Sequence, residues 1–67
     1  MLIYKFDVIF ENQVTGEIEI TKKEYTNCNF FEALDKATAF VKEELKRKHD
    51  ETKSFDWYLN AIKNYLA

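Results

Sequence analysis

One cysteine and one histidine are the side chains of this sequence with the most reactive chemistry. Cys28 lies in the segment 25–34, YTNCNFFEAL, just before a stretch with helical spacing. A thiol at the start of a helix ionises more readily, and beside a base it acts as a nucleophile. The only histidine, His49, follows at the far end of that helix, roughly 25–30 Å away at 1.5 Å per residue. We therefore expect Cys28 to be a small apolar side chain at a helix entrance, and His49 to be a solvated residue at a helix end.

The acidic residues do not form a catalytic or metal-binding pattern. Glu43 and Glu44 are adjacent in sequence, and adjacent residues of a helix point in different directions. One cysteine and one histidine supply too few ligands for a structural zinc site, which takes four. A single glycine excludes a glycine-rich phosphate loop. We expect a protein that is not an enzyme and that needs no metal or cofactor.

A short basic run, KRK at 46–48, is the feature that points to nucleic acid. The formal net charge is −2, with three lysines against seven acids in residues 1–35 and seven basic residues against five acids in residues 36–67. Proteins that bind duplex DNA present a strongly basic face, which this distribution does not predict. A nucleic-acid-binding accessory protein is therefore an alternative function, with single-strand or phosphate contacts from Lys42, Lys46, Arg47 and Lys48.

Size and composition restrict the class of protein. A chain of 67 residues makes one domain, residues 1–67. It is 46% hydrophobic and 33% charged, which is typical of a globular protein. No apolar run reaches the ~20 residues of a membrane span, and no export signal is visible. Together with the lone cysteine, this predicts a cytoplasmic protein that does not associate with membranes.

The first 25 residues predict a β-hairpin. Apolar residues alternate with polar ones over 2–11, which is typical of a strand. A turn that contains the only glycine follows, and a second strand over 17–25 is expected to face the core with Ile18 and Ile20. Tyr25 has the opposite phase, so either a bulge restores its direction or it covers the other face.

Two helices are expected after the hairpin. Asn29 followed three residues later by Glu32 has the spacing of a capping box. The helical stripe that follows is Phe30, Leu34, Ala37, Val41 and Leu45. After a polar connection over 49–54, a second helix is predicted over 55–66. The fold class is then α+β: an N-terminal antiparallel β-hairpin packed by two C-terminal helices, ββαα.

An isolated hairpin has two free edges. The first strand carries one lysine, one aspartate and no proline inside it, so little protects its edge from pairing. Pairing of this strand with its copy in a second molecule predicts a four-stranded sheet across a homodimer.

Aromatic residues exceed the number that such a core holds. The chain has six Phe, four Tyr and one Trp, and aromatic side chains are enriched at protein interfaces. We predict that the side chains off the helical stripes and on the outer hairpin face form a protein interface: Phe31, Trp57, Tyr65, Ile3, Ile9, Glu17 and Glu19.

The composition also suggests a source. Phe, Tyr, Ile, Asn and Lys have AT-rich codons and are abundant here, as in small proteins of AT-rich bacteria, their phages and mobile elements. Such proteins often act by binding and blocking a larger one. The predicted function is therefore a small non-catalytic interaction module with an unidentified protein partner, of the kind that a phage uses to inhibit a host enzyme or defence system. A protein that sequesters a small ligand is a further alternative.

Overall fold

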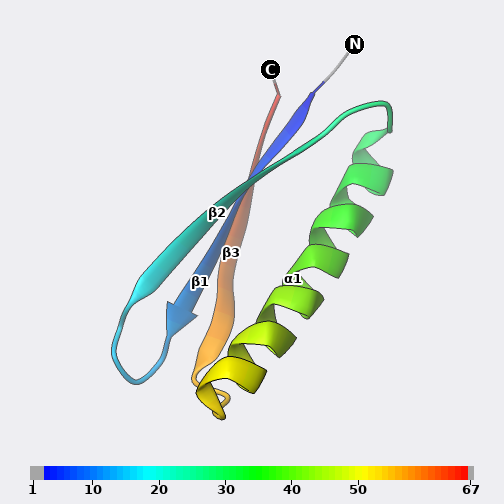
Figure 1. Cartoon of the computed structure of the whole chain (residues 1–67). Coiled ribbons are helices and arrows are strands. Elements are labelled where there is room, and N and C mark those ends of the chain that lie inside the picture. Colours follow the sequence, from blue (N-terminus) through cyan, green and yellow to red (C-terminus); the bar gives the residue numbers. More distant parts are fainter. Residues whose placement is uncertain (1–2, 67) are drawn as a thin grey trace.

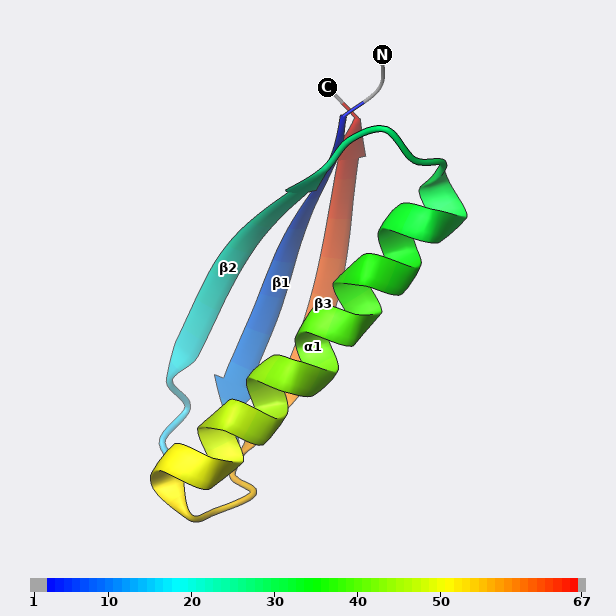
Figure 2. The same ribbon diagram turned by 45° about the vertical axis from the view of Figure 1, so that its right-hand side comes forward.

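The computed structural model describes residues 3–66, which form a three-stranded antiparallel sheet and one helix. The elements in chain order are β1 (Tyr4–Asn12), β2 (Ile18–Tyr25), α1 (Phe30–Thr52) and β3 (Trp57–Leu66). The strand order is β2-β1-β3, so β1 lies in the centre (Figure 1). The helix lies along one face of the sheet and leaves the other face uncovered (Figure 2). Leu2, where the first strand was expected to begin, lies outside the described residues.

The expected ββαα fold is wrong, because the order of elements is ββαβ. The predicted second helix is instead strand β3. In its pairing with β1, Phe10 lies opposite Leu59 whereas Ile9 lies opposite Ala61, so Asn60 is an extra residue in β3. This bulge lets Leu59 and Ile62 pack against the same core although they are three residues apart. A spacing of three imitates a helical stripe, which explains the error.

The position of β1 also overturns the expected four-stranded sheet across a dimer. β1 pairs with β2 along one edge and with β3 along the other, so it has no free edge for a second molecule. The sequence argument was correct that a two-stranded hairpin needs a further partner. That partner is a later segment of the same chain.

The core lies between α1 and the sheet. Alternate residues of β1 and small residues of α1 supply it, and its buried apolar side chains are Tyr4, Phe6, Val8, Phe10, Ala33, Ala37 and Val41. The larger members of the predicted helical stripe pack around this centre and are partly buried. The alternation of β1 and the stripe of α1 are therefore confirmed.

Strand β2 has the opposite phase to the one expected. Its register with β1 is continuous and places Ile20 opposite Ile9, so Ile18 and Ile20 lie on the uncovered face, each 56% exposed. No bulge precedes Tyr25, which has the opposite phase to the isoleucines; because these point outward, Tyr25 lies on the helix side, with its ring 6.0 Å from that of Phe6, and does not cover the other face as the alternative without a bulge expected. The reason is the register of the hairpin: with Phe10 turned inward, Glu19 lies opposite it, so Ile18 and Ile20 turn outward.

The helix begins as the sequence predicts. The Asn29 side chain accepts a hydrogen bond from the backbone N–H of Glu32 at 2.8 Å, and the Glu32 carboxylate accepts one from the backbone N–H of Asn29 at 3.3 Å. Cys28, one residue earlier, is half-buried against the core. At the other end the helix continues to Thr52, further than the predicted polar connection allowed. It ends at Lys53, which has a left-handed backbone (φ 57°) and donates its N–H to the carbonyl of His49.

Replacing Asn29 with alanine is expected to lower the free energy of unfolding by about 1 kcal/mol, because the backbone N–H of Glu32 loses the side-chain oxygen that accepts its hydrogen bond. The measurement is the midpoint of urea unfolding, followed by circular dichroism. Asn29→Asp is the matched control, since aspartate also caps helices, and its midpoint should stay close to that of the original protein. Equal losses in the two variants would contradict the role of the cap.

Candidate functional site

The uncovered side of the sheet, which we call the open face, gathers most of the exposed large apolar side chains. The pairing register places these side chains on it: Lys5, Asp7, Ile9, Glu11, Ile18, Ile20, Lys22, Glu24, Tyr58, Ala61, Lys63 and Tyr65. Seven large apolar residues within 3–66 are exposed, and four of them lie on this face: Ile18, Ile20, Tyr58 and Tyr65. A fifth, Val14, lies in the hairpin loop between β1 and β2.

An apolar row crosses the open face from one edge of the sheet to the other. Ile9 in the central strand lies opposite Ile20 of β2 and opposite Ala61 of β3. Ile18 lies on the same face two residues before Ile20 and is exposed to the same extent. These side chains therefore form a flat apolar band on a surface that no helix covers.

The two carboxylates beside this row are bound by hydrogen bonds within the face. Glu11 accepts one bond from the Tyr58 hydroxyl at 2.8 Å and another from the Asn60 amide at 2.7 Å. Asp7 accepts one from the Tyr65 hydroxyl at 3.2 Å. The bond to Glu11 raises the pKa of Tyr58, and the bond to Asp7 raises the pKa of Tyr65. Because these carboxylates keep donors within the sheet, a partner that covers them does not leave them unpaired.

The row of residues that contains Asp7, next to the apolar row, carries a surplus of positive charge. Asp7 lies between Lys22 of β2 and Lys63 of β3 in the pairing register. Within residues 3–66 neither lysine forms an ion pair, whereas Lys5 in the next row lies 3.7 Å from Glu24. The row of Asp7 therefore has two cations for one anion.

The helix side of the sheet contains a buried lysine. Lys48 is 5% exposed, and its ammonium lies 2.5 Å from a carboxylate oxygen of Glu19. The same ammonium lies 4.3 Å from the ring centroid of Trp57 and 5.5 Å from that of Phe10. The lysine joins the end of α1 to β2, the strand that the helix covers least, so we assign it to the core and not to a binding surface.

The predicted interface residues do not come together in one place. Ile9 and Tyr65 lie on the open face, Ile3 directly precedes β1, and Glu17 directly precedes β2. The other three belong to the helix side. Phe31 is 75% exposed at the start of α1, whereas Glu19 binds Lys48 and Trp57 packs against the core.

The predicted nucleic-acid contacts are also separated. Lys42 and Lys46 are exposed on α1, but Lys48 is buried. Arg47 binds the carboxylates of Glu44 and Glu51, and these bonds raise the pKa of Arg47; the bond from Arg47 in turn lowers the pKa of Glu44. Two of the four cations are therefore already neutralised by acids of the same chain.

Sequence reasoning missed Ile18 and Ile20 as exposed residues. Their alternation with polar residues fits either face of a strand, and the expectation that isoleucine faces a core selected the wrong one. The signal that identifies the right face is the length of the hairpin loop. With Phe10 turned inward, the loop over 13–17 brings Glu19 opposite Phe10 and turns both isoleucines outward.

No reactive centre accompanies these surfaces in the described part of the chain. Cys28 and His49 lie at opposite ends of α1. Among residues 3–66, no group of three or more His, Cys, Asp or Glu side chains is placed to hold a metal ion. The only helix found there is not long and apolar enough to cross a membrane. No protein-family model, curated protein or solved structure matches this chain.

Proposed function

We propose that this protein is a non-catalytic interaction module that binds another protein through the open face of its sheet. The observation that supports the proposal is the concentration of exposed Ile18, Ile20, Tyr58 and Tyr65 on the one face that α1 leaves uncovered. Exposed apolar side chains that lie together, with polar groups around them, are typical of protein contact surfaces.

The side chains of the open face indicate which kind of partner surface would fit it. A partner surface with an apolar ridge fits the band formed by Ile20, Ile9 and Ala61. An acidic side chain next to that ridge would lie over Lys22 and Lys63, whose charges Asp7 only partly neutralises. The face as a whole is balanced, with three lysines and three acids, so we expect apolar contact rather than long-range attraction to supply most of the binding energy.

The mode of action that we propose needs no reactive group on this face. A small sheet that covers a surface of a larger protein would act by occlusion, as small protein inhibitors do. We propose this mode, with a phage or mobile element as the source, on the composition of the chain.

A photo-crosslinking amino acid at position 20 is expected to trap one specific partner in the cells that express the protein. The same amino acid at position 39, an exposed site on α1, is the matched control and should not trap it. An excess of the unmodified protein should compete the adduct away, whereas the variant with both Ile18→Glu and Ile20→Glu should not. These isoleucines are exposed, so the fold should tolerate the charges.

Two results would contradict the proposal. One is equal trapping from positions 20 and 39, which would show that the open face is not the contact surface. The other is equal competition by the doubly substituted protein, provided that circular dichroism shows it to be folded.

A further inference from the structure

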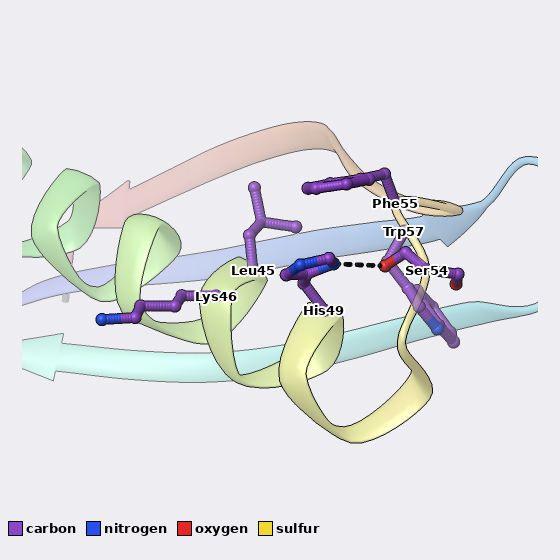
Figure 3. A pocket seen from close by; sticks show the side chains of 6 residues that line it. All are labelled: Leu45, Lys46, His49, Ser54, Phe55 and Trp57. Atoms are coloured by element: carbon purple, nitrogen blue, oxygen red, sulfur yellow. Dashed lines mark hydrogen bonds between the residues drawn. The ribbon is translucent and has the colours of Figure 1, made fainter.

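A cavity of about 340 Å³ lies at the C-terminal end of α1, away from the open face (Figure 3). It is formed by the last turns of the helix, the segment that connects α1 to β3, and the first residue of β3. Its lining residues are Leu45, Lys46, His49, Ser54, Phe55 and Trp57. Its volume is at the lower end of the range of small-molecule sites, about 300–1,000 Å³.

The walls of this cavity are mostly apolar and aromatic. Phe55 is 77% exposed, and its ring stacks on the imidazole of His49 with the centroids 3.9 Å apart and the planes at 16°. The imidazole is itself held in place, because its Nδ1 lies 3.0 Å from the carbonyl oxygen of Ser54 and donates a hydrogen bond to it. Figure 3 shows the two rings one above the other. An exposed phenylalanine is thus fixed beside Leu45 and Trp57, and a flat ring system would bury apolar area against all three.

Two lysines lie on the helix face that carries the cavity, of which Lys46 lines it and Lys42 does not. Lys42 and Lys46 are one helical turn apart, and with Leu45 and His49 they follow the i, i+3, i+4, i+7 spacing of one helix face. Both lysines are exposed, and within residues 3–66 neither forms an ion pair. Of the acids nearby on α1, Glu44 and Glu51 are bound to Arg47, whereas Glu43 and Asp50 are exposed and form no ion pair within residues 3–66. Figure 3 shows the Lys46 side chain directed along α1 and away from the Phe55 and His49 rings, so this exposed lysine would have to rotate toward an anionic group bound beside those rings, with Lys42 one turn further along the helix.

We infer that this cavity binds a small aromatic anion, with its ring system against Phe55, Trp57 and Leu45 and its acidic group toward Lys46 and Lys42. The inference is independent of the open face, because none of these side chains belongs to it. It also gives a role to Phe55, an exposed apolar residue that the proposed protein interface does not use.

Titration with 8-anilinonaphthalene-1-sulfonate tests the inference. Trp57 is the only tryptophan of the chain, so its fluorescence reports directly on a ligand at this site. We expect saturable binding of one probe molecule, with a change in the Trp57 emission. N-phenyl-1-naphthylamine, the same ring system without the sulfonate, is the neutral comparison and should bind more weakly.

Matched variants separate this site from non-specific adsorption. Phe55→Ala should weaken binding of the sulfonate at least about tenfold, because one wall of buried apolar contact is lost. Phe31→Ala is the control, since Phe31 is exposed to nearly the same extent, 75% against 77%, and lies at the other end of α1. Both rings are exposed, so neither substitution should affect folding.

The charge of the ligand is tested separately. The variant with Lys42→Gln and Lys46→Gln should weaken binding of the sulfonate about three- to tenfold and leave the neutral probe unchanged. Lys36→Gln, an exposed lysine outside the cavity, is the control. Absence of saturable binding, or equal effects of Phe55→Ala and Phe31→Ala, would overturn the site. Unchanged sulfonate binding after the two lysine substitutions would overturn the assignment to an anion.

Discussion

Phe10→Ala is expected to leave a large fraction of the molecules unfolded at room temperature. Phe10 is fully buried in the central strand, between Glu19 of β2 and Leu59 of β3. Removing a buried phenylalanine ring lowers the free energy of unfolding by about 3–5 kcal/mol, since the cavity that remains collapses only in part. A domain of this size has roughly 3–5 kcal/mol of net stability in total. The expected loss from this one substitution is therefore about as large as the net free energy of unfolding of the whole domain.

The measurement is the fraction of native circular dichroism and the midpoint of urea unfolding. Phe31→Ala is the matched control, because the same chemical change is made at a ring that is 75% exposed. Its unfolding midpoint should move little, by about 0.5 kcal/mol or less in free energy. Similar losses in the two variants would contradict the placement of the core between α1 and the sheet.

Removing Glu19 is expected to destabilise the fold by about 1–3 kcal/mol, because it leaves the ammonium of Lys48 buried without its carboxylate. Glu19 is itself 42% exposed, so water competes for it and the loss should lie toward the lower end of that range. Lys48→Met behaves differently: it keeps a side chain of similar length against Trp57 and Phe10 and removes the charge. We expect its free energy of unfolding to be within about 1 kcal/mol of the original value, or higher.

The variant that carries both Glu19→Ala and Lys48→Met distinguishes this account from a simple loss of packing. With the lysine already replaced, there is no buried charge to leave unpaired, so Glu19→Ala should cost much less in that background. Urea unfolding of the four proteins gives the coupling between the two sites. If the two losses simply add, the ion pair does not hold β2 to the helix in the way that the structure suggests.

The proposed functions use different parts of the molecule, and their tests are separable. The open face consists of β-strand residues and would contact a protein, whereas the cavity needs Phe55 and the last turns of α1. Ile20→Glu should affect partner trapping and leave the aromatic probe bound. Phe55→Ala should do the reverse, so failure of one proposal leaves the other intact.

Local patterns of the sequence predicted β1 and α1 well. The alternation of β1 and the spacing of the α1 stripe repeat over enough residues to identify both the element and its buried face. The capping box at Asn29 was predictable for a related reason, since it depends only on residues within one helical turn. The predictions were wrong for segments in which the pattern is short or interrupted.

Residues 57–66 illustrate why the predictions for those segments were wrong. An extra residue in β3 changes the spacing of its inward side chains from two to three, and the bulge that causes the change exists only in the pairing with β1. A pattern of neighbouring residues does not predict that pairing. The same holds for Ile18 and Ile20, whose direction is set by the register of β2 with β1.

By itself, the sequence determined a small α+β protein with a helix capped at Asn29 and a strand whose alternate side chains are buried. The tertiary structure decided which strand is central, which side of β2 is exposed, and that Lys48 is a core residue and not part of a basic patch. The physical reason is the range of the interactions. Caps and stripes depend on neighbours in sequence, whereas sheet order, the open face and the cavity beside Phe55 depend on contacts between residues far apart in the chain.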